Sequence, residues 1–135
     1  MPQVRIQVLC GPAAVHPHRM GRSAPAGAGD WYAWRLIGAN NHELGRSARS
    51  FGSYRQALDA FAELRAGADR LVRRPVHDRS TGRWGWRLEL GGVAVAASGR
   101  WYQRDQDSLL SAAKFVELTA GAEPAESVVA LQSRR

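Results

Sequence analysis

Hydrophobic and polar residues alternate along several short segments of this chain, a pattern typical of half-buried strands. The clearest case is 83–90, in which tryptophan and leucine alternate with arginine and glutamate. Successive side chains of a strand point to opposite faces, so Trp86 and Leu88 are expected to point inward and Arg87 outward. The same reasoning predicts further strands at 4–8, 31–37, 42–47, 71–77 and 93–98.

The hydrophobic pattern between these strands changes to a helical period. Residues 54–66 place alanine, leucine and phenylalanine along one stripe, and Ser53-x-x-Gln56 before them fits a capping box. Gly67 stands where a helix often ends in a glycine cap. A second helix is expected to begin at a cap formed by Asp105 or Asp107 and to end near residue 120, before Gly121.

Turn residues separate the strands at matching places. Asn40-Asn41 and Gly91-Gly92 each favour a tight reversal, because these residues adopt left-handed backbone conformations. Pro75 cannot donate a ladder hydrogen bond, so the segment that contains it is expected at a sheet edge.

Two sequence words occur twice, in the same order. Trp34-Arg35-Leu36 returns 52 residues later (86 minus 34), and the Phe-x-Glu-Leu-x-Ala-Gly-Ala word of 61–68 returns at 115–122. Ser47-x-Arg49 likewise returns as Ser98-x-Arg100. A fixed order at a nearly fixed spacing predicts one small structural unit used in tandem.

The repeated words resemble those of the YegP-like family of small tandem domains of unknown function. The resemblance covers roughly residues 30–122 and rests on an aromatic-basic-apolar strand, a turn, a strand ending in serine and an amphipathic helix in each half. It implies a compact α+β fold that often self-associates through its sheets. It implies no catalytic residues.

The expected fold is therefore α+β, with two tandem β-β-(β)-α repeats. Each repeat is expected to form an antiparallel meander sheet covered by one amphipathic helix, and the two repeats to share a core or to pair in a dimer. The predicted parts are 1–30, a short strand and a flexible Gly/Ala/Pro-rich segment; 31–68, repeat 1; 69–82, a basic linker with an edge strand; 83–122, repeat 2; and 123–135, a frayed tail.

Composition places the chain among soluble globular proteins. Its 135 residues are 44% hydrophobic, no run approaches the roughly 18 apolar residues of a membrane span, and no secretory signal pattern begins it. The single cysteine, Cys10, allows no internal disulfide. A cytoplasmic location and no membrane partner are the corresponding expectations.

Positive charge is concentrated in one part of the chain. The net charge is +7, and residues 65–104 contain nine arginines against three acidic residues, a local excess of +6. This basic band runs through the linker and the second set of strands.

Residue patterns that support catalysis are weak. Cys10 has no histidine at a recognisable spacing, and His16 and His18 lack further metal ligands nearby. Gly27-x-Gly29 does not follow a strand, so it is not a phosphate loop. We therefore expect no enzyme activity, no catalytic or metal-binding residues, no cofactor and no small-molecule substrate.

Two functions remain. The first is a structural or interaction module that forms a homodimer through its sheets, since exposed sheet edges make pairing easy. The second is non-specific binding of nucleic acid or another polyanion through the basic band. The candidate contacts for the second function are Arg35, Arg73, Arg74, Arg79, Arg83, Arg87, Arg100 and Arg104, with Trp101 and Tyr102 for stacking on bases.

Overall fold

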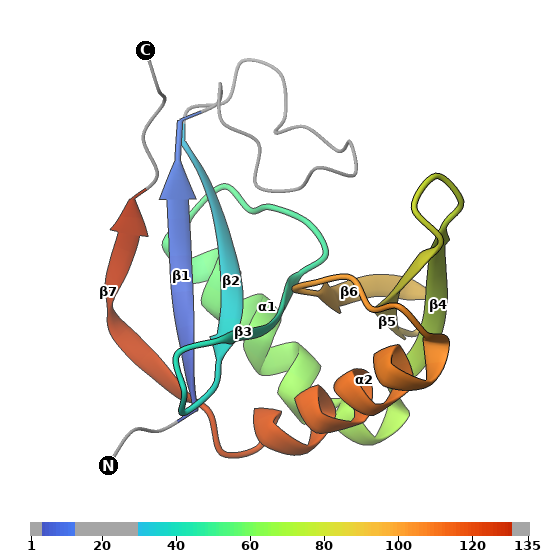
Figure 1. Ribbon diagram of the computed structural model, residues 1–135. Coiled ribbons are helices and arrows are strands. Elements are labelled where there is room, and N and C mark those ends of the chain that lie inside the picture. The colour runs from blue at the N-terminus through green and yellow to red at the C-terminus, as the bar shows by residue number, and fades with distance from the viewer. Residues whose placement is uncertain (1–3, 13–29, 131–135) are drawn as a thin grey trace.

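A computed structural model of the chain describes residues 4–12 and 30–130, with side chains up to residue 122, and shows one curved sheet with two helices (Figure 1). The strand order is β4-β5-β6-β3-β2-β1-β7. All neighbouring strands are antiparallel except β1 and β7, which are parallel.

Most predicted elements lie within one residue of their expected bounds, whereas β1 runs three residues further and β7 and a short 3-10 helix were not expected. In the first half they are β1 (Arg5–Gly11), β2 (Trp31–Ile37), β3 (Glu43–Ser47), α1 (Tyr54–Ala66) and a short 3-10 helix (Ala68–Arg70). In the second half they are β4 (Val72–Asp78), β5 (Arg83–Leu90), β6 (Val93–Ser98), α2 (Asp105–Thr119) and β7 (Glu123–Ala130). As Pro75 predicts, β4 lies at the sheet edge.

The expectation of two separate sheets is wrong, because β3 and β6 pair and join the halves. Arg46 lies opposite Ala97, flanked by the pairs Gly45–Ser98 and Ser47–Ala96. This pairing joins residues 51 positions apart in the chain (97 minus 46). The hydrophobic pattern within each segment does not indicate which distant strand it pairs with.

The expectation of a frayed tail over 123–135 is also wrong where the structure describes it. Residues 123–130 form β7, which runs parallel to β1 and covers what would otherwise be its open edge. The two valines at 128 and 129 favour a strand. Residues 131–135 and most of the predicted flexible segment, 13–29, lie outside the described residues.

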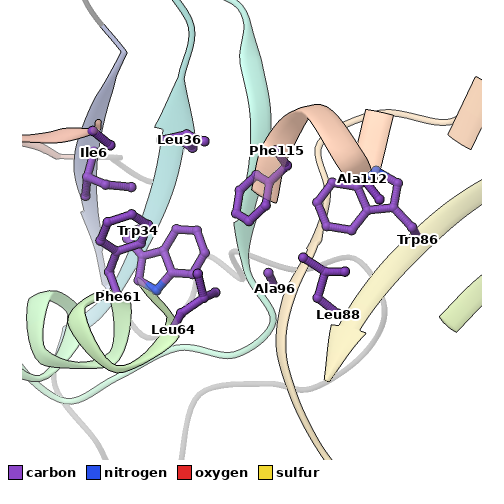
Figure 2. Close-up of a cluster of buried hydrophobic side chains, with 11 residues drawn as sticks. Ile6, Trp34, Leu36, Phe61, Leu64, Trp86, Leu88, Ala96, Ala112 and Phe115 are labelled. Carbon is purple, nitrogen blue, oxygen red and sulfur yellow. The ribbon is translucent and has the colours of Figure 1, made fainter. Parts of the chain in front are cut away.

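Both helices pack on one face of the sheet and share one core. Trp34 meets Phe61 at 5.2 Å between ring centroids, and Trp86 meets Phe115 at 5.2 Å. Phe115 also stacks on Trp34 at 6.1 Å, so this ring lies between the two tryptophans, as Figure 2 shows. Of the two arrangements expected from the sequence, a core shared by the two halves is therefore present.

The repeated words make matching backbone contacts in the two halves. The N–H of Trp34 donates to Ser47 Oγ at 3.3 Å, and the N–H of Trp86 donates to Ser98 Oγ at 3.2 Å. Two residues before each tryptophan, an isolated bridge pairs Tyr32 with Phe51 and Trp84 with Tyr102. The repeated serines therefore tie the end of each hairpin to the strand that carries its tryptophan.

The first helix cap and the Gly91-Gly92 turn have the predicted geometry, but Gly67 does not. Ser53 Oγ accepts from Gln56 N at 3.1 Å, so the first cap is confirmed, and both Gly91 and Gly92 have positive φ. Gly67 follows α1 but its φ is −102°, so left-handed geometry does not explain it. A Cβ there would lie 2.8 Å from Leu90 Cδ1, so a larger residue would require this methyl group to move.

Two serines one turn apart on α2 give a paired test of the core. Ser111 Oγ accepts from Trp86 Nε1 at 3.0 Å and from Tyr102 Oη at 2.7 Å. Ser108 is fully buried, and its Oγ has no partner among the described residues.

We expect Ser111→Ala to lower the free energy of unfolding by about 1–3 kcal/mol, since it leaves the buried Trp86 Nε1 unsatisfied. Ser108→Ala should leave it unchanged or raise it by roughly 0.5–1 kcal/mol, because it removes an unpaired buried hydroxyl from a helix. Urea denaturation of both variants measures the difference. Equal changes in the two variants would contradict the hydrogen-bond assignment.

Candidate nucleic-acid interface

Four arginines lie in one line across the sheet, and we call them the arginine row. Arg74 of β4 pairs with Arg87 of β5, and Arg87 pairs with Ala97 of β6. Ala97 pairs in turn with Arg46 of β3, and Arg46 with Arg35 of β2. Residues in register across neighbouring strands point to the same face, so one sheet face carries all four.

This face is the one opposite the helices. Trp86 and Leu88 on either side of Arg87 are buried in the core, as are Trp34 and Leu36 on either side of Arg35. Strand alternation therefore turns the arginines outward. Neighbouring strands are roughly 4.8 Å apart, so the row from β4 to β2 is about 19 Å long.

Carboxylates neutralise part of the row. Glu43 accepts from Arg46 Nε at 2.8 Å and from Arg35 at 3.5 Å, and it holds these two cations at one end. Arg74 reaches Glu89 at 3.2 Å, with 62% of the arginine side chain exposed. Pairs this exposed contribute little to stability and leave the guanidinium accessible to other anions.

Arg87 differs from the other members of the row. It is exposed, and within residues 4–12 and 30–122 it makes no ion pair or side-chain hydrogen bond. It lies between Arg74 and the small side chain of Ala97. The row therefore has one cation that is free to bind an external anion.

Arg46 belongs to the arginine row but was not among the candidate contacts predicted from the sequence. It lies outside the basic excess at 65–104 and outside the repeated Trp-Arg-Leu word that contains Arg35. Alternation along β3 could have placed it outward, but only the long-range β3–β6 pairing puts it in line with Arg87.

Arg73 lies on the other face. It pairs with the inward-pointing Leu88, and its guanidinium binds Asp105 at 2.9 Å. Asp105 is the first residue of α2 rather than its cap, which is Arg104 without a side-chain cap bond, so the predicted cap is wrong. Arg73 thus ties the edge strand to the start of α2, where the helix dipole favours a carboxylate.

The other candidate arginines surround the hairpin end of the sheet. Arg79 and Arg83 are exposed near the β4–β5 turn, and Arg100 is exposed after β6. Arg104 is exposed and binds Asp107 at 3.3 Å. Hydrogen bonds from the Ser80 hydroxyl and backbone N–H hold the pKa of Asp78 below its ordinary value, so this turn keeps a negative charge beside Arg79.

The two candidate aromatic residues have different surroundings. Trp101 is 39% exposed, and its ring atoms lie 3.2–3.3 Å from where a Cβ on Gly85 would stand. Tyr102 is half-buried and donates its hydroxyl proton to Ser111, so it belongs to the core side. Trp101 alone of the two presents a surface for stacking.

Other chemistry is sparse. Cys10 Sγ lies 3.9 Å from an Asp30 carboxylate oxygen, and a hydrogen bond with Cys10 raises the pKa of neighbouring Tyr32 above its ordinary value.

No group of three metal-ligating side chains occurs among the described residues, and His16, His18, Gly27 and Gly29 lie outside them. No helix in the described part of the chain has the length and hydropathy to cross a membrane.

Comparison with known proteins identifies the fold. No protein-family model and no curated protein matches the sequence. A solution NMR structure of YegP, a protein of unknown function from E. coli, is similar over 100% of this chain and 98% of its own, at 12% identity and a TM-score of 0.58. A UPF0339 protein from Shewanella oneidensis is similar over 93% of this chain and 92% of its own, at 8% identity and a TM-score of 0.55. The chain therefore has the fold of the YegP and UPF0339 proteins.

Proposed function

We propose that this protein is a non-catalytic module that binds nucleic acid, as a polyanion, on the outward face of its sheet. The observation that carries the proposal is the arginine row, in which strand pairing brings four cations from both halves of the chain into one line. Arginine binds phosphate through a rigid fork of donors, and such contacts are independent of base sequence.

We also infer that residues 31–68 and 83–122 are two copies of one unit. In support, the Arg46–Ala97 pair joins positions 51 residues apart, and the pairs on either side of it exchange positions as a two-fold axis requires. Arg35 and Arg87 are then equivalent. The counterpart of Glu43 is Ala94 (43 plus 51), which explains why Arg87 has no carboxylate while Arg35 does.

The free cation is the first target for a test. Arg87→Gln should weaken binding to nucleic acid and reduce the slope of log K against log salt by about 0.7–0.9, the contribution of one phosphate contact. Fluorescence anisotropy with a labelled oligonucleotide, over roughly 0.05–0.2 M salt, measures both quantities.

Arg55→Gln is the matched control for this variant. Arg55 is 78% exposed on α1, on the helix side of the sheet, and its removal changes net charge equally. If Arg55→Gln reduces the slope as much as Arg87→Gln does, the attraction comes from overall charge and not from the row.

Removal of a negative charge, in place of a positive one, tests the end of the row that Glu43 neutralises. Glu43→Gln removes the carboxylate shared by Arg35 and Arg46, and should increase affinity and steepen the salt slope by about 0.7–0.9. Glu63→Gln, on the exposed side of α1, is the control. An affinity that does not rise, in a variant that melts at the parent temperature, would contradict a role for this end of the row.

We propose self-association as the second function. The observation that favours it is an adjacent pair on α2, Leu109 and Leu110, which are 47% and 58% exposed. Pairing through the β4 edge of the sheet has less support, because Pro75 and Arg74 on β4 are residues that oppose it. The apolar Trp31 and Ile37 on the outward face are buried and offer no surface for contact.

Light scattering tests this second proposal. We expect a dimer, and we expect Leu109→Gln combined with Leu110→Gln to return it to the 14.8 kDa of one chain. A parent protein that stays at that mass at every concentration would exclude self-association.

A further inference from the structure

We propose that the ligand of the outward face is single-stranded nucleic acid, with Trp101 stacking on an unpaired base beside a phosphate held by Arg87. This inference rests on the proposed function and names the ligand class. It follows from the position of one exposed aromatic ring relative to the arginine row.

Trp101 is the most exposed of the five tryptophans. Trp31, Trp34 and Trp86 are each 1% exposed, and Trp84 is half-buried with its ring stacked on His77 at 4.1 Å. Trp101 retains 39% of its surface and makes no ring stack within the described residues. An exposed tryptophan with no aromatic partner offers a face on which a base can stack.

Gly85 places this ring beside the arginine row. Trp101 lies against Gly85, where a Cβ would stand 3.2 Å from the ring and 2.8 Å from Ser98 Oγ. Gly85 and Arg87 are two residues apart on β5 and so share a face, roughly 6.8 Å apart along the strand. A stacking surface and a free cation are therefore neighbours, the combination that single-strand binders use.

The dimensions of the face disfavour a duplex. The major groove is about 12 Å wide and admits a helix or a two-stranded ribbon. The row runs about 19 Å across five strands of one continuous sheet. Such a face is too wide for an undeformed major groove, so contacts with a regular duplex fall on its phosphates. The bases inside a duplex are stacked on one another, whereas an unpaired base is free to stack on Trp101.

The experiment compares ligands and variants. An oligo-dT of about 20 nucleotides, longer than most single-strand binding sites, is measured against a duplex of equal length and against inorganic polyphosphate. We expect oligo-dT to bind at least tenfold more tightly than the duplex and to quench tryptophan fluorescence, which polyphosphate should not do.

Trp101→Leu should weaken oligo-dT binding about tenfold, within the range for loss of one stacked base, and leave the salt slope unchanged. Trp101→Phe should retain most of the affinity, because phenylalanine still stacks. Arg87→Gln should reduce the slope by about 0.7. Tyr54→Leu, which removes an aromatic side chain from α1 on the helix side, is the control.

The outcomes separate the inference from the proposed function. Duplex or polyphosphate binding as tight as that of oligo-dT, or a Trp101→Leu variant that binds like the parent, would overturn the single-strand inference. In that case a reduced slope for Arg87→Gln would still support the arginine row. No binding of any polyanion at low salt would overturn the proposed function itself.

Discussion

The ring of Phe115 lies directly on Gly45, and the rest of the structure depends on this contact. A Cβ at Gly45 would stand 2.7 Å from Phe115 Cδ1 and 2.8 Å from the Trp86 ring, so only glycine leaves room for both. Gly45 belongs to β3, the strand that joins the first half of the sheet to β6 of the second. The contact brings α2 over the junction and turns two small layers into one core.

The outward face depends on this inward packing. Because strand side chains alternate with a period of two, burial of Trp34 and Leu36 fixes Arg35 outward, and burial of Trp86 and Leu88 does the same for Arg87. A slip of one residue would exchange arginine for tryptophan in the core and is therefore strongly opposed. The arginine row thus has its register set by the hydrophobic core, although the row itself contributes little to stability.

The patterns of hydrophobic residues and turn residues predicted the parts of the fold that depend on contacts between residues close in the chain. The boundaries of β2, α1, β5 and β6 follow directly from alternation, helical period and turn residues. The pairing of β3 with β6 and of β1 with β7 joins distant segments, so one sheet could not be distinguished from two. The same limit applies to the site, because alternation predicted the outward position of Arg87, but only the long-range pairing places Arg46 in line with it.

The difference between the two halves lies in charge rather than in packing. Each half keeps a tryptophan beneath its helix and a serine that accepts from the tryptophan N–H, because both support the fold. Glu43 binds Arg35 and Arg46 on the outward face, whereas the residue 51 positions later is an alanine, Ala94. Arg35 therefore has a carboxylate partner in Glu43, whereas Arg87 makes no ion pair within residues 4–12 and 30–122. Glu43 therefore neutralises the β2–β3 end of the arginine row and Glu89 pairs with Arg74 at the β4 end, while Arg87 between them keeps its charge unpaired among the described residues.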